Sequence, residues 1–394
     1  MQLSVEWLLA PIEPQRFFAE YYERQPLLIA PGEPRRFEAL TSLAAIDRFL
    51  TTSSPRHPEV LLVDAARALS AEDYTLADGD GRLDLPRAFE LFRSGATISI
   101  RRFHERAPEL AALCRAAEKA FSAHFQTNIY LSPPRAQGFG THFDSHDVFV
   151  LQVAGSKLWT LYDTAIELPL HGQGFDKTKH QPGPPSREIL IRAGDLFYCP
   201  RGLFHSARST EESSLHITLG LIAKTWADLM LEAVAAACLA SPAFRANLPA
   251  GFADANFDVS AAQDKFRELI NTFATEAKLE PILNRLAEEF VASRHPDFRG
   301  ALTAVDQPPA VTADTRLEAR PHLVYRLSED ANSVRLLFGP SSLTFPAVAA
   351  EPIRFALRGL PFLAGDLPGR LDAAGRLVLV RRLLREGLLV TCSA

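Results

Sequence analysis

Three side chains in this sequence could bind one metal ion together. His142 and Asp144 are separated by a single residue in the stretch Gly-Thr-His-Phe-Asp, and His205 follows much later in the chain. Because residues two apart on a β-strand point to the same face, His142 and Asp144 can hold one ion, and a histidine from another strand would complete the set. Two imidazoles and one carboxylate suit non-haem Fe(II) and leave coordination positions open for a co-substrate and oxygen.

The sequence around His205 favours this interpretation over a polar face on a surface strand, which would also explain an isolated His-x-Asp pair. Residues 194–195 and 200–202 are predicted to be turns on either side of a short buried strand at 196–198. We expect His205 to begin the next strand and residues 214–221 to form its partner. Short strands separated by turns are typical of a small barrel or sandwich.

Other histidines lie near these stretches. His146 is an alternative candidate ligand, because it continues the alternation of His142 and Asp144 two residues further on. A turn at Ser145 would direct its side chain elsewhere. His171 and His180 lie within residues 163–187, a segment rich in Pro and Gly without clear periodicity. A loop of this length beside a candidate site is typical of a lid or a substrate-binding element, and we expect its two histidines to be solvated.

Composition excludes several classes of protein. With 394 residues, of which 47% are hydrophobic and 23% charged, the chain is typical of a globular protein with two or three domains. A net charge of −5 argues against wholesale nucleic-acid binding. The scattered cysteines form no Cys-x-x-Cys pair, which favours a reducing cytoplasm over a zinc ribbon or a disulfide scaffold. No signal segment and no apolar run of membrane-spanning length is found, so we expect a cytoplasmic protein without a membrane partner.

Helices and strands are expected on both sides of the metal-binding stretches. Apolar periodicity predicts a short helix followed by a strand at 14–30, a helix at 41–51, a strand at 60–63 and an amphipathic helix at 107–125. A strand is expected at 128–132.

Gly155 is predicted to lie in the turn of a β-hairpin. The apolar stretches on either side, residues 148–153 and 157–162, have the length of strands and are joined by Ala-Gly-Ser. A lysine at the start of the second stretch, Lys157, would then lie close to the turn.

The chain after residue 221 has helical periodicity. A capping box is predicted at Thr225 and Asp228, and further helices are expected from Ser260 and over residues 279–291. Three helices with apolar stripes and no strands need a surface to cover them, which either the barrel or a second subunit could supply. We favour a contact between two copies of the chain.

The C-terminal part is expected to form a separate module. Residues 296–316 carry several prolines and are predicted to be a linker, and short strands around few helices follow from residue 320, which suggests a winged-helix-like domain. From residue 320 onward there are ten Arg against six Asp plus Glu. DNA binding is one interpretation, but a solvated Arg-rich face is favoured because no basic cluster is dense.

The segment from Asn128 to Trp159 resembles the JmjC/cupin-type ribosomal oxygenases. It contains Asn-Ile-Tyr-Leu-Ser-Pro-Pro-Arg, Gly-Phe-Gly-Thr-His and Leu-Gln-Val-Ala-Gly-Ser-Lys-Leu-Trp. Members of that family are Fe(II)- and 2-oxoglutarate-dependent protein hydroxylases. The resemblance implies an α+β fold with four parts, which are N-terminal elements packing on the barrel (1–90), a double-stranded β-helix or jelly-roll barrel (91–222), a helical dimerisation region (223–300) and a C-terminal winged-helix-like domain (317–394).

The resemblance also implies roles for single residues. The family's Fe(II) ligands fall on His142, Asp144 and His205, and its basic anchor for the distal carboxylate of 2-oxoglutarate falls on Lys157. An ammonium inside a barrel is costly unless it meets an anion, and a dicarboxylate supplies one. The alternative for Lys157 is an exposed residue of the predicted hairpin.

Further polar residues match positions that line the same pocket. Asn128 and Tyr130 alternate on one face and would line the co-substrate site, with ordinary barrel packing as the alternative. His216 and Thr218 share a face of the last barrel strand. They could contact co-substrate or substrate, or be satisfied polar groups of the core.

The implied reaction consumes O2 and 2-oxoglutarate and hydroxylates a side chain of a protein or peptide. By resemblance the substrate would be a ribosomal protein, and a biosynthetic precursor peptide is equally compatible with these residues. Two alternatives remain open. One is a hydroxylase of a small metabolite in the same barrel, and the other is a non-enzymatic cupin-like regulator that binds DNA through its C-terminal module.

Overall fold

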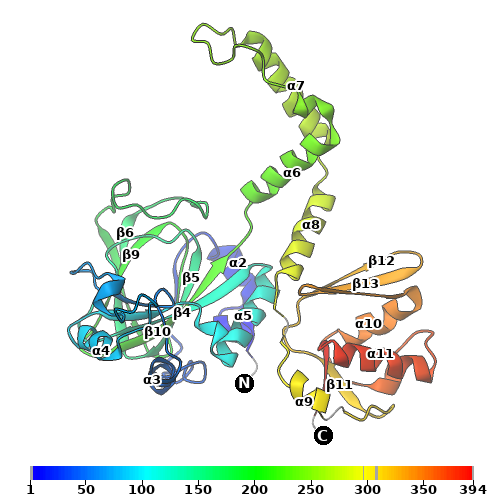
Figure 1. The fold of residues 1–394 in the computed structure, drawn as a ribbon, viewed down its shortest axis with the longest axis horizontal. Helices are drawn as coiled ribbons and strands as arrows, with labels where there is room; N and C mark the ends of the chain where they lie inside the picture. Colours follow the sequence, from blue (N-terminus) through cyan, green and yellow to red (C-terminus); the bar gives the residue numbers. More distant parts are fainter. Residues whose placement is uncertain (1–2, 296, 307–308, 393–394) are drawn as a thin grey trace. The chain divides into compact units, whose positions relative to one another are not determined.

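The computed structural model describes residues 3–295, 297–306 and 309–392 (Figure 1). It divides the chain into two compact units, Met1–Ala223 and Lys224–Ala394. Within the described residues, no helix combines the length and the apolar character that a membrane crossing requires.

Two antiparallel β-sheets form the centre of the first unit. The larger has the strand order β1-β8-β5-β10-β4-β3-β2, and the smaller has the order β7-β6-β9. Apolar side chains of β5 and β8 in the larger sheet and of β6 and β7 in the smaller one share a buried core between the sheets. The predicted barrel of short strands is therefore confirmed. The strands are β1 Leu27–Ile29, β2 Val60–Val63, β3 Thr97–Ile100, β4 His124–Ser132, β5 Asp147–Ala154, β6 Ser156–Ala165, β7 Pro185–Arg192, β8 Leu196–Cys199, β9 Leu203–Ser209 and β10 Ser214–Ile222.

The predicted pairing of consecutive strands is wrong at two places. β5 pairs with β8 and β10, whereas β6 pairs with β7 and β9, so the segment around Gly155 joins the two sheets and is not a hairpin turn. Likewise β9 pairs with β6, and its expected partner β10 pairs with β4 and β5. The pattern of apolar residues is the same whether the next strand stays in the sheet or crosses to the other one, so it could not separate the two topologies.

Gly155 allows this crossing between the sheets. Its backbone has φ +63°, a left-handed conformation, and a Cβ there would overlap the carbonyl oxygen of Ser213. Glycine is the residue that meets both conditions.

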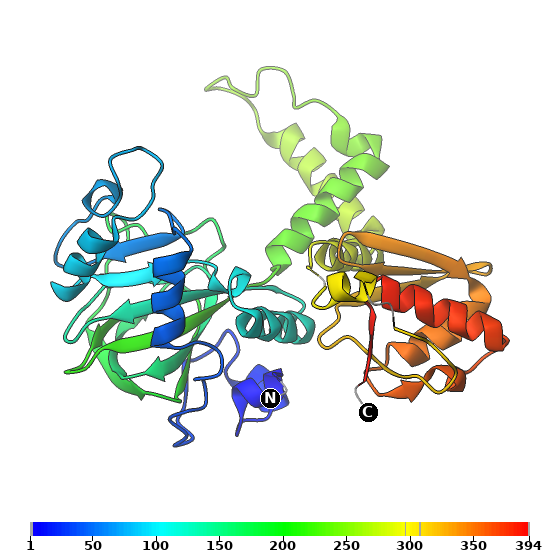
Figure 2. The same ribbon diagram turned by 60° about the horizontal axis from the view of Figure 1, so that its bottom comes forward.

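Helices cover the outer face of the larger sheet. They are α1 Val5–Leu9, α2 Pro14–Glu20, α3 Leu43–Thr52, α4 Leu85–Arg93 and α5 Pro108–Phe121. In Figure 2, α3 lies across the strands of this sheet, and its buried face joins the main core of the unit. The helix predicted to reach Phe125 ends at Phe121, because Ser122 adopts a left-handed conformation and β4 starts at His124.

The second unit begins with three helices, α6 Trp226–Ala240, α7 Ser260–Glu276 and α8 Leu279–Ala292. The predicted capping box at the start of α6 is confirmed, since the Thr225 hydroxyl accepts from the Asp228 backbone N–H and the Asp228 carboxylate accepts from that of Thr225. The segment 296–316, predicted to be a linker, contains a short helix, α9 Ala301–Asp306. Residues 296, 307 and 308 of that stretch lie outside the described residues.

Two small sheets and two helices complete the second unit around a core of their own. The sheets have the strand orders β15-β11-β16 and β12-β13-β14. Strands β11 and β15, of four and two residues, are too short to show a periodicity and were not predicted. Strand β14 was not predicted either. The elements are β11 Arg316–Ala319, β12 Tyr325–Glu329, β13 Ser333–Phe338, β14 Ser341–Pro346, α10 Ala350–Ala356, β15 Phe362–Leu363, α11 Ala373–Arg385 and β16 Leu389–Thr391.

Candidate metal centre

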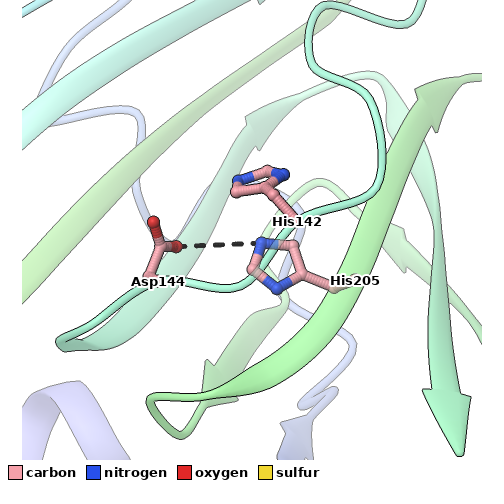
Figure 3. Close-up of side chains that lie close together, drawn as sticks. All are labelled: His142, Asp144 and His205. Atoms are coloured by element: carbon pink, nitrogen blue, oxygen red, sulfur yellow. Dashed lines mark ion pairs between the residues drawn. The ribbon is translucent and has the colours of Figure 1, made fainter. Parts of the chain in front are cut away.

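His142, Asp144 and His205 converge beside the interior of the barrel (Figure 3). The potential ligand atoms of the three side chains all lie within 4.8 Å of one another. His205 Nε2 is 3.7 Å from Asp144 Oδ2, the pair joined by the dashed line in Figure 3. Among the described residues, this is the one such group of three His, Cys, Asp or Glu side chains that could hold a metal ion.

The backbone fixes the three residues relative to one another. His205 is the third residue of β9, and it exchanges two backbone hydrogen bonds with His142, of 2.8 and 3.1 Å, in an isolated antiparallel bridge. Asp144 lies in the irregular segment before β5, where its carbonyl oxygen accepts from the Gly202 N–H at 2.8 Å. The prediction that His142 and Asp144 share a regular strand is therefore wrong, although the two side chains do meet.

Both imidazoles are oriented with Nε2 available. His142 Nδ1 lies 2.8 Å from the carbonyl oxygen of Gly140, and His205 Nδ1 lies 3.0 Å from that of Leu203. A carbonyl can only accept, so each Nδ1 donates and each Nε2 keeps its lone pair for a metal. Burial lowers the pKa of His205 to about 4, so the ring is neutral at pH 7. This donor set fits a divalent metal such as Fe(II).

A cavity of about 360 Å³ opens in the barrel beside these ligands. Strands β3, β4 and β10 of the larger sheet supply a polar wall, and β5, β6 and β8 supply apolar residues. The principal polar side chains of the wall are Thr97, Ser99, Gln126, Asn128, Tyr130, His216 and Thr218. A volume of this size is appropriate for a small organic co-substrate together with part of a second molecule.

Lys157 points into this cavity and is buried, which contradicts the alternative of an exposed hairpin residue. Its Nζ donates to Ser132 Oγ at 3.1 Å. Among the described residues that line the cavity, Asp144 is the one carboxylate, and it belongs to the metal group. Burial lowers the pKa of Lys157 to about 7. A buried ammonium without a carboxylate partner is the feature expected of a binding site for an anion.

The four remaining predicted residues lie on two paired strands. Asn128 is opposite Thr218, and Tyr130 is opposite His216, with the two rings stacked at a centroid distance of 5.0 Å. Asn128 Oδ1 accepts from the backbone N–H of Arg102 at 3.1 Å.

Burial affects the polar atoms of Tyr130 and His216 in different ways. Burial and the nearby Asp144 carboxylate raise the pKa of Tyr130, so its hydroxyl stays protonated and able to donate. His216 is buried, and its Nδ1 has no hydrogen-bond partner, which contradicts the alternative of a fully satisfied core residue.

The other histidines are not part of the ligand group. His146 lines the cavity, with its ring against Gly220 in β10. His180 Nδ1 accepts from the backbone N–H of Asp176 at 3.0 Å within its own loop, and its ring stacks with Phe175. His171 contributes its carbonyl oxygen to a hydrogen bond from Ser145. The bend at Ser145 separates His146 from the alternation of His142 and Asp144.

Two features of the cavity were not predicted from the sequence. Ser132, the partner of Lys157, follows Tyr130 at the two-residue spacing of a strand face, so the signal was present in the sequence. Strand β3 was not predicted, and with it the positions of Thr97 and Ser99 in the cavity wall. Its four residues are too few to show a clear alternation.

Comparison with known proteins agrees with this geometry. Residues 102–229 match the family model described as JmjC domain. Ribosomal oxygenase 1 of Rattus norvegicus is 28% identical, with 98% of this chain and 72% of the relative covered. The bifunctional lysine-specific demethylase and histidyl-hydroxylase NO66 of Aedes aegypti is 31% identical over 57% of this chain and 35% of its own length. This chain spans 64% of bovine and 47% of human ribosomal oxygenase 1.

A solved structure covers almost the whole chain. YcfD, a ribosomal oxygenase from Escherichia coli in complex with cobalt and succinic acid, superposes with a TM-score of 0.55 over 97% of this chain and 99% of its own, at 14% identity. This likeness concerns the fold, which is the JmjC/cupin fold with mixed α and β elements. Residues 102–229 therefore match a JmjC domain, and the chain is similar in sequence to ribosomal oxygenases.

Proposed function

We propose that this protein is an Fe(II)- and 2-oxoglutarate-dependent oxygenase that hydroxylates a side chain of a ribosomal protein or another protein or peptide. The observation that carries the proposal is the convergence of His142, Asp144 and His205 beside a cavity that also holds the buried ammonium of Lys157. The relatives named ribosomal oxygenase and histidyl-hydroxylase support a protein substrate.

The residues of the cavity have distinct tasks in this reaction. His142 Nε2, His205 Nε2 and the Asp144 carboxylate would hold Fe(II), which supplies the activation of O2 when it is bound. Lys157 would pair with the distal carboxylate of 2-oxoglutarate, and this pairing keeps its proton on Nζ. The barrel core of β5 to β8 excludes water from one side of the cavity.

The polar wall would orient the bound molecules. The protonated hydroxyl of Tyr130 can donate to a carboxylate or to the substrate, while Asn128 and Thr218 sit side by side on the adjoining strands. Because Asn128 Oδ1 is already used by the Arg102 backbone, its amide N–H groups are the atoms that remain to donate.

Two measurements test this proposal. Anaerobic addition of 2-oxoglutarate to the Fe(II)-loaded protein should produce a visible charge-transfer band that His205→Ala lacks. Incubation with ribosomal proteins in air should then produce succinate and add about 16 Da, one oxygen atom, to a protein. Absence of both the band and succinate would refute an oxygenase, and oxidation of free amino acids alone would support the small-metabolite alternative.

We also propose that the helical region 223–300 forms a homodimer. The side chains of Trp226, Leu231 and Phe266 on α6 and α7 are 75%, 71% and 64% exposed, although they are large and apolar. Apolar surface of this kind is typical of a protein interface. Light scattering should give a dimer mass for the wild type and for the control Ala261→Asp, an exposed position on another face of α7, and a monomer mass for Phe266→Asp.

For residues 317–394 we propose a winged-helix-like domain without nucleic-acid binding. Helices α10 and α11 and the two small sheets support the first point. Arg376 donates to the carbonyl oxygen of Gly365, and Arg381 donates to that of Val311, so these arginines serve the domain itself. We therefore expect no mobility shift of DNA at low salt.

A reducing cytoplasm is proposed as the location of the protein, because its four cysteines are free thiols.

A further inference from the structure

A buried ion network lies next to the candidate metal ligands. Arg201, in the turn between β8 and β9, contacts two carboxylates. Its Nη2 lies 2.7 Å from Glu23 Oε1, and its Nη1 lies 3.9 Å from Asp147 Oδ2. The side chain of Arg201 is 9% exposed and that of Asp147 1%. Burying charged groups costs free energy unless they are paired. A buried network of this kind therefore indicates a structural or functional role.

Tyr198 joins the same groups through its hydroxyl. The hydroxyl donates to Asp147 Oδ1 at 2.6 Å and accepts from the backbone N–H of Glu23 at 2.9 Å. Glu23 has φ +58°, a left-handed conformation that is uncommon for a residue with a side chain and that its surroundings must hold in place. The N-terminal segment after α2 is thereby fixed to the barrel.

The network is connected to the metal ligands through short stretches of backbone. Asp147 is the first residue of β5, shortly after Asp144 in the chain, and it accepts a second hydrogen bond from the backbone N–H of Arg201 at 3.4 Å. The next residue, Gly202, donates its N–H to the carbonyl oxygen of Asp144 at 2.8 Å. His205 follows in β9. The turn that carries Arg201 is thus attached to both of the segments that present Asp144 and His205.

We propose that Arg201, held between Asp147 and Glu23, is a positioning residue for the metal ligands Asp144 and His205. Its two ion pairs keep the turn between β8 and β9 against the start of β5, and that contact fixes the separation of the two ligands. The guanidinium is suited to this task because its planar fork directs separate N–H groups at the two carboxylates, whereas the ammonium of a lysine is a compact point charge. The inference rests on the proposed metal site and deepens it.

The test compares the metal affinity of two buried-arginine variants. Arg201→Met removes the network's positive charge while it keeps an unbranched side chain. Arg36→Met is the matched control, because Arg36 is also partly buried, also has one unpaired buried nitrogen, and donates to the carbonyl oxygens of Trp7, Leu8 and Ala10. The dissociation constant for Co(II) and the visible spectrum of the Co(II) protein are measured together with the thermal midpoint of the metal-free protein.

We expect Arg201→Met to weaken Co(II) binding by about 10- to 100-fold and to change the Co(II) spectrum. Arg36→Met should lower the thermal midpoint and leave metal affinity within about twofold of the wild type. Arg201→Lys should fall between the wild type and Arg201→Met. Equal Co(II) affinity and equal spectra in wild type and Arg201→Met would overturn the proposal.

Glu23→Gln keeps the test decisive if Arg201→Met does not fold. It removes one charge from a partly exposed side chain, and we expect a metal affinity about threefold weaker or more, within the range for outer-shell contacts. An unchanged affinity would count against the network. If the wild-type protein itself failed to bind Co(II), the metal site and not the positioning role of Arg201 would be wrong.

Discussion

Replacement of Lys157 by methionine should stabilise the metal-free protein and at the same time weaken its binding of 2-oxoglutarate. The substitution keeps a long unbranched side chain and removes the charge. Lys157 is buried, and its one hydrogen-bond partner among the described residues is the hydroxyl of Ser132. If Lys157 served only to fill space in the core, Lys157→Met would instead destabilise the protein.

The magnitude follows from the pKa of Lys157, which burial lowers from 10.5 to about 7. Each pKa unit corresponds to about 1.4 kcal/mol. The folded-state pKa lies below that of the unfolded chain, so the unfolded chain binds more protons between these values and stability rises with pH there. The cost of burying the ammonium is about 4 kcal/mol at pH 7 and falls to about 2 kcal/mol at pH 9. These values are upper limits, because water in the cavity would solvate the ammonium.

Urea denaturation of the metal-free protein at pH 7 and pH 9 measures this difference. We expect Lys157→Met to be more stable than wild type at pH 7, with a smaller gain at pH 9. The control Lys119→Met, at an exposed position on α5, should stay within about 0.5 kcal/mol of wild type at both values. The co-substrate affinity of Lys157→Met should fall by about 10- to 100-fold, as expected for a lost charge-assisted hydrogen bond. A less stable variant with unchanged affinity for 2-oxoglutarate would refute this reasoning.

Three further predictions concern pH, the metal and the crossing between the sheets. In wild type, 2-oxoglutarate affinity, measured by calorimetry, should be highest below pH 7 and fall by up to about tenfold per pH unit above it, as Lys157 loses its proton; a flat profile from pH 6 to 9 would contradict this. His205→Ala should bind Co(II) more than about 100-fold more weakly than wild type in equilibrium dialysis and lose the thermal stabilisation that metal gives; an unchanged metal-induced shift would exclude His205 as a ligand. Gly155→Ala should cost about 2 kcal/mol or more in urea denaturation, because of its positive φ and the overlap with a carbonyl oxygen, whereas Gly172→Ala, with open space around it, should cost about 0.5 kcal/mol or less.

The sequence alone predicted much of the local structure and identified the candidate metal ligands. Apolar periodicity predicted most helices and strands of the first unit, and the Thr225–Asp228 capping box was correct because it is a contact within four residues. The types of the three candidate metal ligands restricted the chemistry, since two imidazoles and a carboxylate are selective for few metals. The role of Lys157 was implied by the resemblance to the ribosomal oxygenases and was not deduced from the pattern of its strand.

The pairing of the strands was decided only by the tertiary structure. Apolar alternation shows which face of a strand is buried but carries no information on which strand lies next to it, so the hairpin at Gly155 was predicted where the chain crosses to the other sheet. Asp144 meets His142 and His205 although it lies outside any regular strand, because Gly202 holds its carbonyl oxygen.

The network of Arg201, Asp147 and Glu23 likewise exists only in the folded chain. Its members are far apart in the sequence. Each of them is a charged residue of a type that is usually found on the protein surface. Burial removes the water that would otherwise solvate their charges. The ion pairs between them must then compensate for the lost solvation. The sequence therefore determined which atoms could bind a metal, and the fold determined which residues hold those atoms in place.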